Sequence, residues 1–129
     1  MDANKNITLL IADDEAAIRN GLSTVVPWEQ FGITIVGTAE DGREAYDIIK
    51  SCNPDIVITD IRMPGMDGLE TLRHMKEKAP NLPVILLTGH ACMGVAVQGL
   101  DLGAYDYMLK PVAISELIIK MEEAARSAM

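Results

Sequence analysis

Five short runs of β-branched and aliphatic residues recur along the chain, and longer segments with helical spacing separate them. This alternation predicts an α/β fold in which one doubly wound parallel sheet carries helices on both faces. The first, third and fourth runs are almost continuously apolar, as is typical of strands buried on both faces. The second and fifth runs are more polar and are the expected edge strands. The five expected strands are Ile7–Ile11, Ile33–Val36, Ile56–Thr59, Val84–Leu87 and Tyr105–Leu109.

Apolar stripes at i, i+3, i+4 and i+7 predict the helices between these runs. The stripes are Ile18, Leu22 and Val25; Ala45, Ile48, Ile49 and Cys52; Leu69, Leu72 and Met75; and Ile114, Leu117, Ile118, Met121, Ala124 and Ala125. A fourth segment, from about Met93 to Leu102, is weak because Gly94 and Gly99 each cost ~1 kcal/mol relative to alanine inside a helix. We expect this fourth helix to be the most mobile element.

The length of 129 residues fits one domain over residues 1–129, with a core from about 7 to 126. No apolar run approaches the ~20 residues that a membrane-spanning helix needs. The first six residues lack the pattern of a signal peptide, so a cytoplasmic location is expected. Cys52 and Cys92 have no zinc-site spacing and are expected to be small buried or half-buried thiols.

The formal net charge of −8 argues against nucleic-acid binding by these residues, which would need a cationic surface. The same acidity suits a hard cation.

Polar residues stand where four of the expected strands end. They are Asp13 and Asp14 after the first strand, Asp60 after the third, Thr88 after the fourth and Lys110 after the fifth. In open α/β sheets the functional site lies beyond these carboxyl ends. We therefore expect the five side chains to share one rim of the sheet.

Taken singly, each of these residues has an ordinary interpretation. Asp13 or Asp14 could cap a helix, Asp60 could cap a turn, Thr88 could be a plain strand residue and Lys110 could be solvated. Taken together they need a cation, because two carboxylates ~5 Å apart repel by about 3 kcal/mol at an effective dielectric near 20. Lys110 supplies one positive charge and a bound Mg²⁺ would supply two.

This combination resembles the receiver domain of bacterial response regulators. The matching residues are the acidic pair Asp13-Asp14, Asp60 within the string Ile58–Gly68, Thr88, and Lys110-Pro111. The resemblance spans nearly the whole chain. It implies the flavodoxin-like strand order 2-1-3-4-5, with five helices.

The resemblance also implies a chemistry. Asp60 would take a phosphoryl group from a phosphohistidine of a sensor histidine kinase. Asp14, Asp60 and the backbone carbonyl of Arg62 would bind Mg²⁺, with Mn²⁺ as a possible substitute, and Asp13 would act through metal-bound water. Lys110 and the Thr88 hydroxyl would contact the phosphoryl oxygens. The Lys110-Pro111 peptide would be cis. The chain would act only on itself, by phosphotransfer and autodephosphorylation, and not as an enzyme on other substrates.

The resemblance implies a switch as well. Thr88 would move towards the phosphate and Tyr107 would turn inward, which changes the surface of the fourth helix, fifth strand and fifth helix. A homodimer could form through that surface. The ordinary alternative for Tyr107 is a half-buried aromatic residue on an edge strand.

The output of such a switch would lie outside these residues. The strings 26–32 and 102–107 resemble receivers joined to AraC-type DNA-binding domains that control transcription, whereas residues 91–95 depart from that subgroup. Trp28 and Phe31 are expected to cover one end of the core. Two histidines are expected to be ordinary: His90 at the rim near solvent, and His74 on the surface.

Three rival functions remain. A haloacid-dehalogenase-type phosphatase would need a second aspartate at position 62, which is arginine, and a cap region. A flavodoxin-like cofactor binder would need a phosphate-binding loop where Asp13 and Asp14 would repel phosphate. A receiver that no longer takes phosphate would lack key residues, yet all of them are present.

Overall fold

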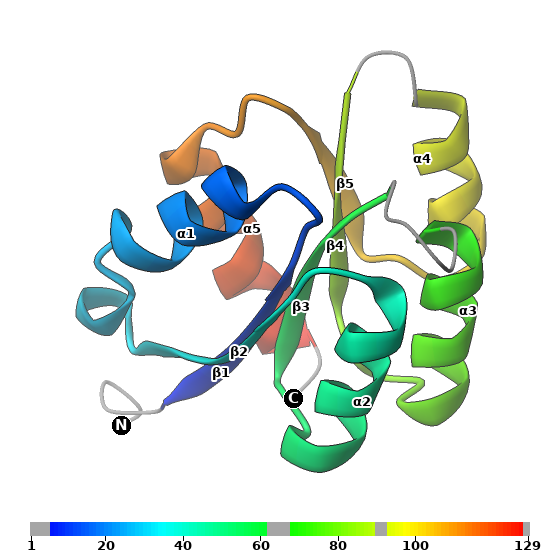
Figure 1. Cartoon of the computed structure of the whole chain (residues 1–129), viewed down its shortest axis with the longest axis horizontal. Helices are drawn as coiled ribbons and strands as arrows, with labels where there is room; N and C mark the ends of the chain where they lie inside the picture. The colour runs from blue at the N-terminus through cyan, green and yellow to red at the C-terminus, as the bar shows by residue number, and fades with distance from the viewer. Residues whose placement is uncertain (1–5, 62–67, 90–92, 128–129) are drawn as a thin grey trace.

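The computed structural model describes residues 6–61, 68–89 and 93–127, which form a single five-stranded parallel sheet between helices (Figure 1). The strand order is β2-β1-β3-β4-β5, as the resemblance implied. The strands are β1 (Ile7–Ala12), β2 (Ile33–Ala39), β3 (Ile56–Asp60), β4 (Val84–Thr88) and β5 (Asp106–Leu109). The helices are α1 (Ala16–Thr24), the 3₁₀ helix η1 (Trp28–Phe31), α2 (Gly42–Cys52), α3 (Gly68–Lys78), α4 (Met93–Asp101) and α5 (Ile114–Ser127).

Helices cover both faces of the sheet, with α1 and α5 on one side and α2, α3 and α4 on the other (Figure 1). Successive residues of the central strands point to opposite faces, so each strand contributes to two cores. Leu10 and Val57 pack with α2, α3 and α4, whereas Leu9 and Ile58 pack with α1 and α5. This burial on two faces explains why β1, β3 and β4 are apolar along nearly their whole length. The more polar strands β2 and β5 lie at the edges of the sheet, as expected.

Local signals set the ends of several helices. The Asp41 side chain accepts the backbone N–H of Glu44 and caps the start of α2, and Asn53 ends this helix in the left-handed conformation at φ 46°. Gly103 takes a φ of 108° in the turn after α4, which a side chain would disfavour. The Lys110-Pro111 peptide is cis, which confirms that prediction.

Some sequence-based expectations were wrong in detail. Cys52, the last residue of α2, is exposed, and Cys92 lies outside the described residues. Trp28 is buried and donates its Nε1–H to the carbonyl of Leu22, as expected for a residue that closes the core. Phe31 is instead exposed at the end of η1, a helix that the sequence did not predict.

The end of one strand also differs from the prediction. β2 continues to Ala39, past the predicted end at Val36, because the pairing skips Val36, and Gly37 and Thr38 then pair with Leu10 and Ile11. Among the described residues, no helix combines the length and apolar character needed to cross a membrane.

Candidate functional site

The sheet brings the predicted site residues together at one edge. Asp13 follows β1, Asp60 ends β3, Thr88 ends β4 and Lys110 follows β5. The strands are parallel and adjacent in the order β1-β3-β4-β5, so their carboxyl ends share this edge. Asp60 lies in register with Leu87, one residue before Thr88, and the Lys110 N–H donates to the carbonyl of Thr88 at 2.8 Å. We call this group of side chains, with Asp14 and Glu15, the acidic rim.

Lys110 is the centre of the acidic rim. Its Nζ lies 3.0 Å from Oδ2 of Asp13, 3.4 Å from Oδ2 of Asp60 and 3.5 Å from Oε1 of Glu15. Burial alone would lower the pKa of Lys110, but the hydrogen bond to Asp13 and the charges of Asp60, Asp13 and Glu15 outweigh it and raise the pKa. The ammonium therefore stays charged and holds three carboxylates that would otherwise repel one another.

Asp13 is fully buried and firmly held. Its Oδ1 accepts the N–H of Glu15 at 2.9 Å, and its own N–H donates to the carbonyl of Ala39 at 2.9 Å. The ordinary interpretation of Asp13 or Asp14 as the cap of α1 does not hold, because the N-cap residue is Glu15 and no side chain caps that end. A buried aspartate with a charged partner, placed where a ligand can reach its neighbours, is typical of a functional site.

An oxygen-only cluster offers ligands for a divalent cation. One carboxylate oxygen from each of Asp13, Asp14 and Glu15 lies within 4.8 Å of the others, and Asp14 and Glu15 are exposed. Oxygen donors of this kind suit Mg²⁺. Asp60 joins the same surroundings through Lys110, while Arg62, whose carbonyl was predicted as a ligand, lies outside the described residues.

Thr88 and Tyr107, the predicted switch residues, lie on neighbouring strands. The Thr88 side chain is fully buried, and its hydroxyl donates to the carbonyl of Gly89 at 3.1 Å. Tyr107 lies opposite Leu86 in register, is half-buried, and packs against the core beneath α2, α3 and α4. This position fits both the switch and the ordinary edge-strand interpretation, so the switch role stays a prediction.

Sequence reasoning missed two charged residues beside the site. Glu15 contacts Lys110, and its position directly after the acidic pair was an available signal. Arg19, one turn after Glu15, donates from Nη1 to the carbonyl of Asp13 at 2.7 Å. Of the predicted histidines, His74 is half-exposed and lies 3.8 Å from a carboxylate oxygen of Glu77, and His90 lies outside the described residues.

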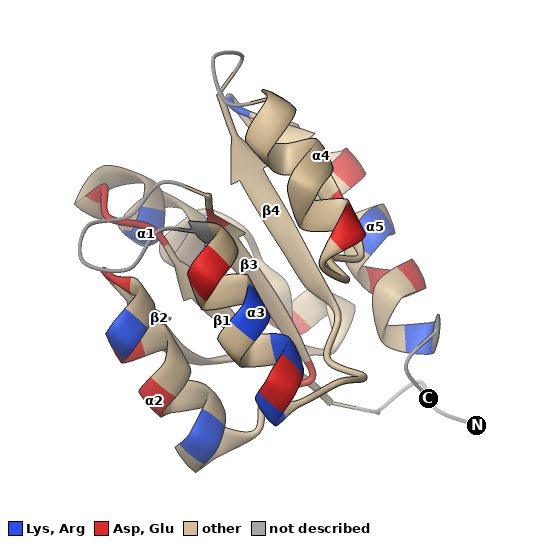
Figure 2. Ribbon diagram, turned by 90° about the vertical axis from the view of Figure 1, so that its right-hand side faces the viewer, with Lys and Arg blue, Asp and Glu red and all other residues tan. Residues whose placement is uncertain are grey.

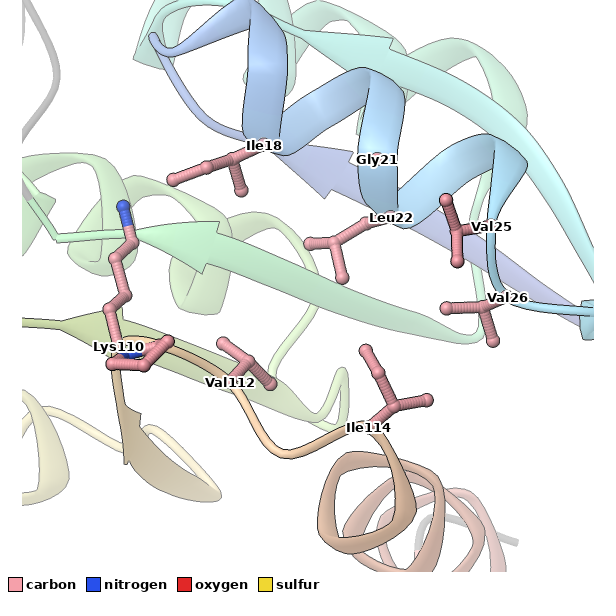
Figure 3. A pocket seen from close by; sticks show the side chains of 9 residues that line it. Ile18, Gly21, Leu22, Val25, Val26, Lys110, Val112 and Ile114 are labelled. Atoms are coloured by element: carbon pink, nitrogen blue, oxygen red, sulfur yellow. The ribbon is translucent and has the colours of Figure 1, made fainter.

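An apolar groove begins at Lys110 and runs between α1 and the chain leading into α5 (Figure 3). Its volume is about 340 Å³. Ile18 and Leu22 of α1 and Val25 just after it form one wall, and Val112 and Ile114 form the other. Val25 was predicted to belong to the core stripe of α1, but it is the C-cap of this helix and is 77% exposed beside the groove.

Comparison with known families identifies the kind of domain. Residues 9–122 match the family model described as "Response regulator receiver domain". The uncharacterized transcriptional regulatory protein YesN of Bacillus subtilis is 38% identical over 115 residues, which are 89% of this chain and 31% of that protein. The response regulator MprA of Mycolicibacterium vanbaalenii is 38% identical over 120 residues, 93% of this chain and 51% of that protein. The chain thus spans about half or less of the length of these relatives.

Solved structures agree. A response regulator receiver domain protein from Clostridium thermocellum superposes with a TM-score of 0.86 at 32% identity, covering 94% of this chain and 95% of that one. The REC domain of AraT, a response regulator from Geobacillus stearothermophilus, gives a TM-score of 0.86 at 35% identity and covers 94% of each chain.

Proposed function

The chain belongs to the response regulator receiver family, and we propose that it serves as the phosphoacceptor switch of a two-component system with Asp60 as its acceptor. The phosphoryl donor is a sensor histidine kinase. The observation that carries the proposal is the position of Lys110, whose ammonium lies within 3.5 Å of carboxylate oxygens of Asp13, Glu15 and Asp60. A cation shared in this way is already aimed at the place where a phosphoryl group on Asp60 would put its oxygens.

The chain's own groups account for the transfer. A carboxylate oxygen of Asp60 attacks phosphorus, the N–P bond of the phosphohistidine breaks, and the imidazole leaves as the phosphoryl group becomes an acyl phosphate. Lys110 pairs with one phosphoryl oxygen. The Thr88 hydroxyl, which donates to the carbonyl of Gly89 in this structure, donates to a second phosphoryl oxygen instead. Asp13, Asp14, Asp60 and the carbonyl of Arg62 would hold Mg²⁺ or Mn²⁺, which when bound neutralises charge on the phosphoryl group. Phosphotransfer to Asp60 and autodephosphorylation are the only reactions that we propose. We place both in the cytoplasm.

We propose that the conformational change passes from the site through Thr88 and Tyr107. Drawing the Thr88 hydroxyl to the phosphoryl group frees space below it, and Tyr107 turns inward. The surface of α4, β5 and α5 changes with it and could pair with the same surface of a second copy. The relative YesN, named as a transcriptional regulatory protein, supports an output in transcription, through a DNA-binding domain outside these residues.

The apolar groove supports the proposed donor. It shares Lys110 with the acidic rim, so a kinase helix packed along Ile18, Leu22 and Val25 would bring its phosphohistidine towards Asp60. Apart from Lys110, the side chains that line it are apolar, as the core of a transient interface requires.

The decisive test of the acceptor is chemical. The chain, incubated with Mg²⁺ and a small phosphodonor such as phosphoramidate, should gain the mass of one phosphoryl group, and Asp60→Asn should gain none. Asp55→Asn, on an exposed loop before β3, is the matched control and should label normally. Labelling that persists in Asp60→Asn would rule out the acceptor. Release of phosphate from small phosphate monoesters would favour the phosphatase alternative.

A charged substitution at the exposed end of the groove tests whether a kinase docks there. Val25→Glu should slow transfer from a sensor kinase that phosphorylates the unchanged chain by about tenfold, because a carboxylate would be desolvated in the interface. Labelling by phosphoramidate should not change. Val97→Glu, at a 50% exposed residue of α4, is the control and should leave both rates unaltered. Equal slowing with both donors would mean that Val25 acts through the fold and not through docking.

A further inference from the structure

Arg19 links the two loops that border the acidic rim. It lies on α1, and only 17% of its side chain is exposed. Its Nη1 donates to the backbone carbonyl of Asp13 at 2.7 Å, and its Nη2 lies 3.9 Å from Oε2 of Glu40, in the loop after β2. The planar guanidinium offers donors in a fixed geometry, so it can serve both loops at once.

The contact with Arg19 completes the hydrogen bonding of Asp13. The other three polar groups of this buried residue are already bonded, its N–H to Ala39, its Oδ1 to the N–H of Glu15, and its Oδ2 to Lys110. Without Arg19, the carbonyl of Asp13 would lose its charged donor, and leaving a buried carbonyl unpaired is costly. The peptide that follows this carbonyl leads directly to Asp14, so its orientation also sets where the Asp14 carboxylate lies.

Two roles for Arg19 predict opposite effects on a bound cation. If Arg19 only balanced the charge of the acidic rim, its removal would make the site more negative and bind a divalent cation more tightly. If it holds the loop in place, its removal would let the ligands drift apart and weaken binding, as happens when outer partners of metal ligands are lost. The geometry favours the second role, because Arg19 touches the backbone of Asp13 and not a carboxylate of the rim.

We propose that Arg19 is a positioning residue, which fixes the loop from Asp13 to Glu15 for cation binding and so for phosphoryl transfer to Asp60. This inference rests on the proposed function, since it assigns Arg19 a part in that same site. Arg19 touches no reacting atom and acts only through Asp13.

The test measures Mg²⁺ binding directly, by isothermal titration of the unphosphorylated chain. Arg19→Met should bind Mg²⁺ about 10- to 100-fold more weakly than the native chain. Arg19→Lys keeps the charge but has a single ammonium in place of the fork, so its loss should be smaller. Arg43→Met removes the same charge from the exposed start of α2 and should bind Mg²⁺ no more weakly than the native chain. Phosphorylation by phosphoramidate should fall in the same order at a fixed, subsaturating Mg²⁺ concentration.

Affinity in Arg19→Met that equals or exceeds the native affinity would overturn the proposal. A merely structural role would lower the thermal midpoint without changing Mg²⁺ affinity at temperatures where the chain is folded, so both are measured. If Arg19→Met does not fold, Arg19→Lys decides: native affinity overturns the proposal and weaker affinity supports it. A native chain that binds Mg²⁺ but gains no phosphoryl group contradicts the proposed function alone. A native chain that binds no Mg²⁺ contradicts both.

Discussion

The corner where β1 meets α1 and the corner where β4 meets α4 lie at the same edge of the sheet but are built differently. At the first, Asp13 is held on four sides, and Lys110 and Arg19 both reach into it. At the second, the Thr88 hydroxyl donates to the carbonyl of its own neighbour, Gly89. Asp101 is the single charged residue of α4, which is nearly all tan in Figure 2, whereas α2 and α3 carry both signs. The first corner is held by contacts that join separate elements, whereas the Thr88 hydroxyl at the second bonds within its own loop, so we expect the second corner to move more easily.

Removing Lys110 should break the held corner and have the largest effect. Lys110→Met leaves Asp13 buried without its cation, so the free energy of unfolding without Mg²⁺ should fall by about 3 kcal/mol. Saturating Mg²⁺ should restore part of the loss, because it binds the folded state only. Urea unfolding with and without Mg²⁺ measures both effects. Lys50→Met, on the exposed face of α2, should cost no more than about 0.5 kcal/mol.

If Lys110→Met is no less stable than Lys50→Met, the three carboxylates do not depend on this lysine, and the contrast between the two corners is lost.

Alanine substitutions at the two glycines of α4 test how closely this helix packs on β4. A Cβ on Gly99 would lie 2.4 Å from Cδ1 of Leu86, which is fully buried, whereas a Cβ on Gly94 would meet nothing within 4 Å. Gly99→Ala should therefore lower the free energy of unfolding by about 1 kcal/mol, since overpacking outweighs the gain in helix propensity. Gly94→Ala should raise it by up to about 1 kcal/mol.

Urea unfolding of the two alanine variants gives the comparison. A similar gain in both would show that α4 is not packed closely on β4. Amide exchange in α4 as slow as in β3 would argue separately against the expected mobility of this helix.

The smallest effect is expected at Lys120, a surface counterpart of Lys110. Lys120 of α5 pairs with Asp106 at the other end of β5 at 2.5 Å, and this hydrogen bond raises the pKa of Lys120. Both partners are about one-third exposed, so Lys120→Met should cost only about 0.5 kcal/mol at pH 7. Because the folded pKa is raised, this contribution is complete below pH 10.5 and is lost as the pH rises through the folded pKa.

Urea unfolding of the native chain and Lys120→Met at pH 7 and above pH 11 checks the sign, since the difference between them should shrink at the higher pH. A cost as large as that of Lys110→Met would mean that burial is not what distinguishes the two lysines.

The fold was predictable because its signals are local and repeated. Each central strand is apolar on both faces, and α5 follows its stripe from Ile114 to Ala125. Cys52 and Val25 broke the pattern at the ends of their helices: Cys52 is the last residue of α2, Val25 is the C-cap of α1, and both are exposed. Periodicity shows which face of a helix is apolar but not whether the residues at the end of the stripe are covered.

The acidic rim was predictable in part. Asp13, Asp60, Thr88 and Lys110 could be placed because strand ends converge in any parallel sheet. Arg19 could not, because it reaches the site from a helix face through a backbone carbonyl, which no residue pattern encodes. The distances within the acidic rim could not be predicted either, because they depend on how several carboxylates share the ammonium of Lys110.

Lys110 lines both the acidic rim and the apolar groove. A partner seated in the groove would therefore lie over the acceptor and keep solvent from a newly made acyl phosphate. Hydrolysis would then begin only after the partner departs, so the lifetime of the signal would depend on how quickly that surface is vacated as well as on the chemistry of Asp60.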